Sequence, residues 1–209
     1  MSNAETIKNI ALAVGAGRTA VSAAVTAIIA YKGLNKWQNE LKGKASFDLA
    51  RSLARATFKL RDELVYCRSP FIPASEYPDD YNTFDENTAE KKGDAFAHIY
   101  AKRWKPVTEA IQVFDTCVLE AEALWGSGIK EKTNNLRECV VQLKNSTNAV
   151  VRDKYTGGRD FQVDTEFGKL MRNDVSILDD NDPKDPLSLK INSSIEGIED
   201  EIRPHLSCS

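Results

Sequence analysis

Along most of the chain, apolar residues are spaced as in helices that bury one face. After Gly33, and again in the stretches 89–125, 128–154 and 187–206, apolar residues recur every three or four positions. This spacing matches the 3.6 residues per turn of an α-helix. No long stretch alternates as a strand does, apart from a weak candidate at 160–163. The pattern predicts an all-α protein: an N-terminal helix followed by an antiparallel bundle of long amphipathic helices.

One segment is apolar on every side. Residues 10–31 contain a single charged side chain, Arg18, and as a helix they would extend about 33 Å, enough to cross a bilayer. Arg18 opposes insertion, because an arginine near the centre of a span costs roughly 2.5–3.5 kcal/mol. We expect residues 1–33 to form a membrane anchor. The alternatives are a buried or oligomerising Ala-rich helix and a cleaved signal peptide.

Basic residues crowd the C-terminal flank of this run. From Lys32 to Arg61 there are eight lysines and arginines against two acidic residues, whereas Lys8 is the one basic side chain before the run. Retained positive charge marks the cytoplasmic side of a span, so we expect a single span with the N-terminus outside and residues 34–209 in the cytoplasm. The residues expected at the inner interface are Tyr31, Lys32, Lys36 and Trp37.

Small residues repeat every four positions inside the apolar run, at Gly15, Thr19, Ala23 and Ala27. Such a row lets two helices approach closely, either in a homo-oligomer or with an unknown protein partner. An Ala-rich helix also produces such rows by chance. The row is therefore a candidate membrane or oligomer face, with a plain helix surface as the alternative.

Proline and glycine divide the remainder into helices and loops. Ser69-Pro70 should end the first long helix, because proline disfavours helix in the residue before it. Residues 69–88 contain three prolines and form a connection that is either a functional loop or a connector packed through its aromatic residues. Pro106 should kink or restart the second helix. A looser acidic segment, 155–186, precedes the C-terminal helix 187–206.

Composition leaves little room for catalytic chemistry. The 209 residues are 42% hydrophobic and 28% charged, with a net charge of −3, as in ordinary folded proteins. Two histidines and scattered cysteines supply few ligands or nucleophiles, and no CxxC, HExxH or glycine-rich phosphate loop occurs. The acidic run 179–185 lacks the glycine and closing glutamate of an EF-hand loop. Cys67, Cys117 and Cys139 lie in apolar helical patterns, where thiols usually pack as small core residues.

These observations favour a protein that binds rather than one that catalyses. We expect no catalytic residue, metal, cofactor or small-molecule substrate, and no nucleic-acid partner, because the chain is acidic and its basic stretch adjoins the apolar run. Only a pocket that gathers Arg61, Arg68 and Arg103 with carboxylates would favour an enzyme. The leading hypothesis is a membrane-anchored helical scaffold or adaptor. The alternative is a soluble, cytoplasmic helical assembly whose Ala-rich N-terminal helix mediates oligomerisation or partner binding.

Several motifs of the chain resemble those of a family of small uncharacterised bacterial proteins. They are 34–43 (LNKWQNELKG), 49–51 (LAR), 59–62 (KLRD), 68–72 (RSPFI), 102–104 (KRW), 119–126 (LEAEALWG) and 198–204 (IEDEIRP). Members of the family carry one N-terminal membrane segment before a helical cytoplasmic region. The resemblance implies a location in the bacterial inner membrane and brings no activity with it.

Overall fold

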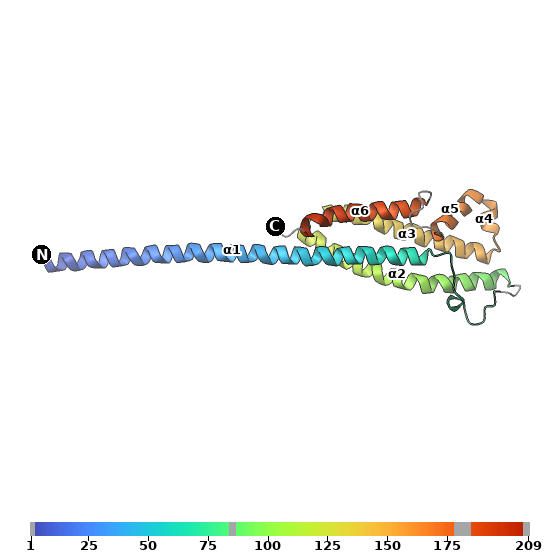
Figure 1. The fold of residues 1–209 in the computed structure, drawn as a ribbon, viewed down its shortest axis with the longest axis horizontal. Coiled ribbons are helices and arrows are strands. Elements are labelled where there is room, and N and C mark those ends of the chain that lie inside the picture. The colour runs from blue at the N-terminus through green and yellow to red at the C-terminus, as the bar shows by residue number, and fades with distance from the viewer. Residues whose placement is uncertain (1–2, 84–86, 178–184, 207–209) are drawn as a thin grey trace. The chain divides into compact units, whose positions relative to one another are not determined.

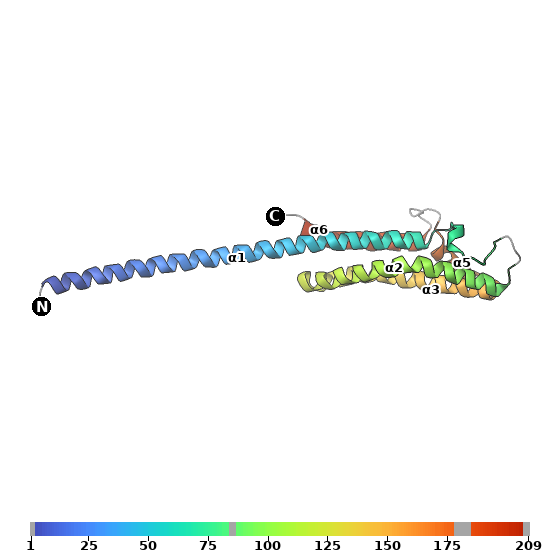
Figure 2. The ribbon, with the colours of Figure 1, turned by 90° about the horizontal axis from the view of Figure 1, so that it is seen from below.

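The computed structural model describes residues 3–83, 87–177 and 185–206; for residues 3–25 and 27 it describes the backbone alone. In these ranges every regular element is helical (Figures 1 and 2). In chain order the elements are α1 (Asn3–Cys67), the 3₁₀ turn η1 (Ala74–Glu76), α2 (Ala89–Trp125), α3 (Gly128–Tyr155), α4 (Arg159–Val163), α5 (Thr165–Val175) and α6 (Pro186–Leu206). The predicted all-α class is confirmed. The weak strand candidate at 160–163 is wrong, because these residues belong to α4.

The chain divides into two compact units, residues 1–45 and 46–209. The first unit consists of the N-terminal part of α1, which contains no proline and is rich in alanine, the residue with the highest helix propensity. The same helix continues through Gly43 and ends at Cys67, shortly before Pro70, as the sequence predicts.

One hydrophobic core holds the second unit together. Four helical segments supply most of it, namely residues 46–67 of α1 together with α2, α3 and α6. Large side chains with 0% exposure include Leu53, Leu60, Leu64, Ile99, Phe114, Leu136, Leu143, Leu187 and Ile198. Complete burial of one such side chain stabilises the fold by about 1.5–3 kcal/mol. Within this core, α3 packs against both α2 and α6.

The apolar stripe predicted for the first long helix is buried over only part of its length. From Leu49 to Leu64 the stripe lies in the core, as expected. Leu34, Trp37 and Leu41 were expected to continue it, but they are 57%, 58% and 48% exposed. The sequence pattern predicts which face of a helix is apolar, and here no described residue covers that face before Leu49.

The second long helix has the predicted bounds, Ala89–Trp125, but it does not restart at Pro106. A proline removes one backbone hydrogen bond and crowds the preceding turn. Trp104 and Val107, on either side of it, are both buried in the core. Core packing on both sides of the proline therefore holds α2 as one element.

Local capping explains where several helices begin and end. Thr88 caps α2, since its side chain accepts a hydrogen bond from the Lys91 amide at 3.2 Å. Gly126, with φ of +91°, ends α2 in a backbone conformation that favours glycine. Asp164 caps α5 by accepting a hydrogen bond from the Phe167 amide at 2.9 Å. Helices α4 and α5 give structure to part of the segment predicted to be looser.

Candidate functional site

Residues 28–44 of α1, the α1 band, expose large apolar and basic side chains together. Tyr31 is 68% and Trp37 58% exposed. Lys32 and Lys36, the other two residues predicted for a membrane interface, are also exposed. Contiguous exposed apolar side chains in a folded protein usually mark a contact surface. The α1 band is therefore a candidate attachment site.

The predicted small-residue row precedes the α1 band on the same helix. Gly15, Thr19, Ala23 and Ala27 all fall within α1. Their side-chain surroundings lie outside the described part of the chain. A role of this row in helix–helix contact stays a prediction.

No described part of any helix combines the length and apolar character needed to cross a bilayer. Most of the apolar run 10–31 falls on residues 1–25 and 27, whose side chains are not among those described. The structure thus gives no support of its own to a span at 1–33, which stays a prediction from the sequence.

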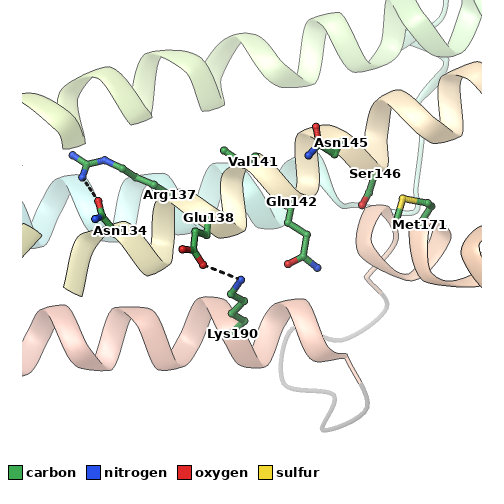
Figure 3. Close-up of a pocket in the computed structure, with 9 residues that line it drawn as sticks. All are labelled: Asn134, Arg137, Glu138, Val141, Gln142, Asn145, Ser146, Met171 and Lys190. Carbon is green, nitrogen blue, oxygen red and sulfur yellow. Dashed lines mark hydrogen bonds and ion pairs between the residues drawn. The ribbon is translucent and has the colours of Figure 1, made fainter. Parts of the chain in front are cut away.

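A cleft of about 580 Å³ lies along α3 in the second unit (Figure 3). Seven residues of α3 line it, together with one residue from α5 and one from α6. They are Asn134, Arg137, Glu138, Val141, Gln142, Asn145, Ser146, Met171 and Lys190. Amide, charged and apolar groups thus share one opening, as in sites that bind a ligand of mixed polarity.

The charges of the cleft already have partners within the chain. Lys190 Nζ lies 3.4 Å from Glu138 Oε2, and the Arg137 guanidinium donates to Asn134 at 3.0 Å (dashed lines in Figure 3). Arg137 also donates to Asp115 on α2 at 2.7 Å. Exposed ion pairs contribute only about 0–1 kcal/mol, so these pairs can rearrange around a ligand.

One wall of the cleft is fixed by a buried carboxylate. Asp174, at the end of α5, is 3% exposed and accepts hydrogen bonds from Ser146 Oγ at 2.6 Å and from Gln142 Nε2 at 3.2 Å. Its backbone carbonyl accepts a hydrogen bond from Arg68 at 2.6 Å. The polar groups at this end of the cleft are therefore held in place before any ligand binds.

Each of the three arginines whose clustering would have favoured an enzyme pairs with a different carboxylate. Arg68 is fully buried and pairs with Asp185 at 2.6 Å. Arg103 is 2% exposed and pairs with Glu76 at 2.6 Å. Arg61 lies at the surface, paired with its neighbour Asp62.

At the other end of the core, α1, α2 and α6 meet in a cluster of two stacked rings and one hydroxyl. Trp125 Nε1 donates to Ser46 Oγ at 2.8 Å, and Ser46 Oγ lies 2.9 Å from His205 Nδ1. The rings of Trp125 and His205 stack with centroids 4.1 Å apart. A serine nucleophile needs a base that a third group orients, and no carboxylate of the described residues bonds to His205. The cluster joins three helices and does not resemble a nucleophilic site.

Two of the described cysteines, Cys67 and Cys139, are packing residues. Burial raises the pKa of the Cys67 thiol to about 12 and also raises the pKa of Cys139 above its usual value. Both side chains are buried in the core. Thiolate is the reactive form of cysteine, so neither thiol is poised for chemistry at neutral pH. Their predicted role as small core residues agrees with these positions.

Among the described side chains, no three His, Cys, Asp or Glu groups lie together in a way that could hold a metal ion.

Comparison with protein-family models, with curated proteins and with solved structures finds no match to this chain.

The cleft and the Trp125 cluster were not predicted from the sequence. Each brings together residues of three helices, and Ser46 is 159 residues from His205. The one local signal for the cleft was the polar face of α3, on which Asn134, Gln142 and Asn145 recur among charged residues. Solvated helix faces have the same composition, so this signal alone does not identify a cleft.

Proposed function

We propose that the protein is a non-catalytic helical scaffold or adaptor, anchored in the bacterial inner membrane by the N-terminal part of α1. The proposal includes an N-terminus outside the cell membrane and residues 34–209 in the cytoplasm. The observation that carries it is the order of features along one uninterrupted helix. The apolar run 10–31 leads into the exposed aromatic and basic α1 band, and then into the core stripe from Leu49.

The chemistry of the α1 band supports attachment to a membrane. Tyrosine and tryptophan favour the headgroup region, and lysine favours its cytoplasmic side. A basic residue close to an anionic membrane surface contributes about 1 kcal/mol. Tyr31, Lys32, Lys36 and Trp37 are exposed and follow directly after the apolar run.

The second unit supports the scaffold role. We infer an antiparallel four-helix bundle formed by residues 46–67 of α1 with α2, α3 and α6, with short loops or loop-and-helix connections between successive helices. The cleft along α3 offers amide, charged and apolar groups to a partner.

A second candidate is a helical assembly held together through α1. Leu34 and Leu41 are seven residues apart and both exposed, which is the spacing of a coiled-coil seam. The small-residue row at Gly15, Thr19, Ala23 and Ala27 would extend such a contact.

Deletion of residues 1–32 separates the two candidates. An anchor predicts that the full chain needs detergent and that the truncated chain is a folded monomer released from membranes. An assembly predicts that the full chain is a defined oligomer without detergent and that truncation gives a smaller species. Size-exclusion chromatography with light scattering measures the mass, and circular dichroism verifies the fold.

Charge reversal in the α1 band gives a matched test of the membrane proposal. The double variant Lys32→Glu/Lys36→Glu should bind anionic vesicles at least about tenfold more weakly, given about 1 kcal/mol per basic residue. The control is Lys91→Glu/Lys92→Glu, which reverses two exposed lysines at the start of α2. Equal loss in both variants would argue against a specific role of the α1 band.

A further inference from the structure

The loop that follows α1 is held in place by one buried side chain. Arg103 of α2 donates hydrogen bonds to the carbonyl oxygens of Ser69 at 2.6 Å and Phe71 at 2.7 Å, and to Glu76 Oε2 at 2.6 Å. The Tyr66 hydroxyl donates to the other oxygen of Glu76 at 2.7 Å. These contacts fix the loop backbone from its buried side, while Phe71 remains 74% exposed.

The same loop forms a small pocket with aromatic walls, the tyrosine pocket, of about 390 Å³. Its lining residues are Ile72, Ala74, Tyr77, Tyr81, Asn82 and Thr83. The rings of Tyr77 and Tyr81 stack with centroids 5.2 Å apart and planes within 5° of each other. A pocket of this size accepts a short extended segment more readily than a helix, whose diameter with side chains is about 10–12 Å.

Two acidic side chains adjoin the tyrosine pocket in the sequence. Asp79 and Asp80 lie between Tyr77 and Tyr81 and are both exposed. Neither forms an ion pair with a residue in the described part of the chain. Their charge is therefore available to a cationic group on a ligand, and it would repel an acidic one.

We propose that the tyrosine pocket binds a proline-rich segment of a partner protein that carries an arginine or lysine beside its prolines. Such segments already adopt the polyproline II helix and dock into aromatic-lined grooves with little loss of entropy. A basic side chain next to the prolines would pair with Asp79 or Asp80. The contacts of Arg103 lower the cost of binding further, because the loop needs less ordering.

This inference gives the proposed adaptor a class of partner, and it does not depend on attachment to a membrane. Every residue it uses belongs to the unit 46–209. A chain that fails to bind membranes could still bind the peptide, and the reverse also holds. The failure of one proposal is therefore distinguishable from the failure of the other.

The test uses the full chain in a mild non-ionic detergent and a fluorescein-labelled peptide of Pro-Pro-Leu-Pro repeats followed by two arginines. Fluorescence anisotropy should give a dissociation constant below about 1 mM, and binding at least about tenfold weaker for each of two control peptides. One control has alanine in place of proline, and the other has glutamate in place of arginine. No binding of the first peptide up to about 1 mM, or equal binding of the alanine peptide, would overturn the proposal.

Variants of the protein locate the site. Asp79→Asn/Asp80→Asn should weaken binding about tenfold, whereas Glu131→Gln/Glu199→Gln, which neutralises two exposed carboxylates on α3 and α6, should leave it unchanged. Tyr81→Leu should weaken binding as well, and the aspartate pair keeps the test valid if this substitution disturbs the loop. Equal affinity of the aspartate variant and the unmodified chain contradicts the site.

Discussion

At the scale of single residues, the protein depends on two arginines that are buried with their partners. Arg68 and Arg103 are the largest fully buried side chains among the described residues, and both donate hydrogen bonds to carboxylates and backbone carbonyls. A buried ion pair adds little net stability compared with an apolar pair, but removal of one partner leaves an uncompensated charge. Each arginine also joins segments far apart in the sequence, so its loss should release a loop as well as a charge.

Replacement of Arg103 by methionine should therefore lower the free energy of unfolding by about 3–5 kcal/mol, because Glu76 would remain buried without its cation. The matched control is Arg61→Met, which breaks the exposed pair with Asp62 and should change stability by less than about 1 kcal/mol. Urea denaturation followed by circular dichroism measures both. Similar losses in the two variants would show that the Arg103 contacts do not hold the loop.

Buried neutral groups should make the protein less stable in alkali. Burial raises the pKa of Cys67 from 9.0 to about 12 and that of Tyr100 from 10.0 to about 12. At a pH between the ordinary pKa and the raised pKa of each group, the folded chain keeps a proton that the unfolded chain releases. The free energy of unfolding should then fall as pH rises from about 9 towards 12, and the two groups leave stability unaffected at lower pH.

Other groups also titrate in alkali, so the test compares how the free energy of unfolding changes with pH in Tyr100→Phe and in the unmodified chain. Between about pH 8 and pH 11, Tyr100→Phe should lose on the order of 1 kcal/mol less stability than the unmodified chain. Tyr66→Phe is a less suitable comparison, because it would also remove the hydrogen bond from the Tyr66 hydroxyl to Glu76. Parallel pH curves for Tyr100→Phe and the unmodified chain would contradict the assigned burial of this hydroxyl.

At the scale of elements, α1 has an apolar stripe that is covered on one part and exposed on another. Leu60 has 0% exposure, whereas Leu34 is 57% exposed. Truncation of a buried leucine removes its transfer free energy and leaves a cavity.

Leu60→Ala should therefore destabilise the protein by about 2–5 kcal/mol, and Leu34→Ala should leave the unfolding midpoint nearly unchanged. The comparison keeps the chemistry constant and changes only the position along one helix. Urea denaturation of both variants is sufficient. A large loss in Leu34→Ala would mean that a further part of the chain, or a second copy, covers the α1 band.

Two glycines in neighbouring helices give a second paired prediction. A Cβ at Gly168 would lie 2.6 Å from Phe161 Cβ, whereas one at Gly197 would meet only the flexible end of Lys132 at 3.8 Å. Gly168→Ala should destabilise by about 1–3 kcal/mol through overpacking. Gly197→Ala should stabilise by about 0.5–1 kcal/mol, as alanine does inside helices. Thermal unfolding measures both, and opposite signs are the expected result.

Much of the secondary structure was predictable, because its causes are local. The bounds of α2 follow from the Thr88 cap, the apolar period and Gly126, and α6 begins one residue before its predicted start. Whether an apolar helix face is buried was not predictable, as the exposed Leu34 and Leu41 show. Periodicity identifies the apolar face but does not reveal which residues pack against it. The restart at Pro106 does not occur, because core packing outweighs one lost hydrogen bond, and a kink there stays a prediction. The cleft and the tyrosine pocket depend on contacts between segments that a linear pattern does not contain.

At the scale of the whole molecule, we propose different tasks for the two compact units. The unit 1–45 carries the apolar run and the α1 band, and we assign it to attachment. The unit 46–209 carries the core, the cleft and the tyrosine pocket, and we assign it to partner binding. Attachment and binding should therefore be separable by substitutions in one unit that leave the other intact.

The most direct measurement is extraction of membranes from cells that produce the full chain, first with high salt and then with alkaline carbonate. If the apolar run lies within the bilayer, as we propose, the full chain should resist both treatments and need detergent. The chain 33–209 should appear in the supernatant, folded and monomeric. Recovery of the full chain in the supernatant without detergent would contradict the membrane anchor.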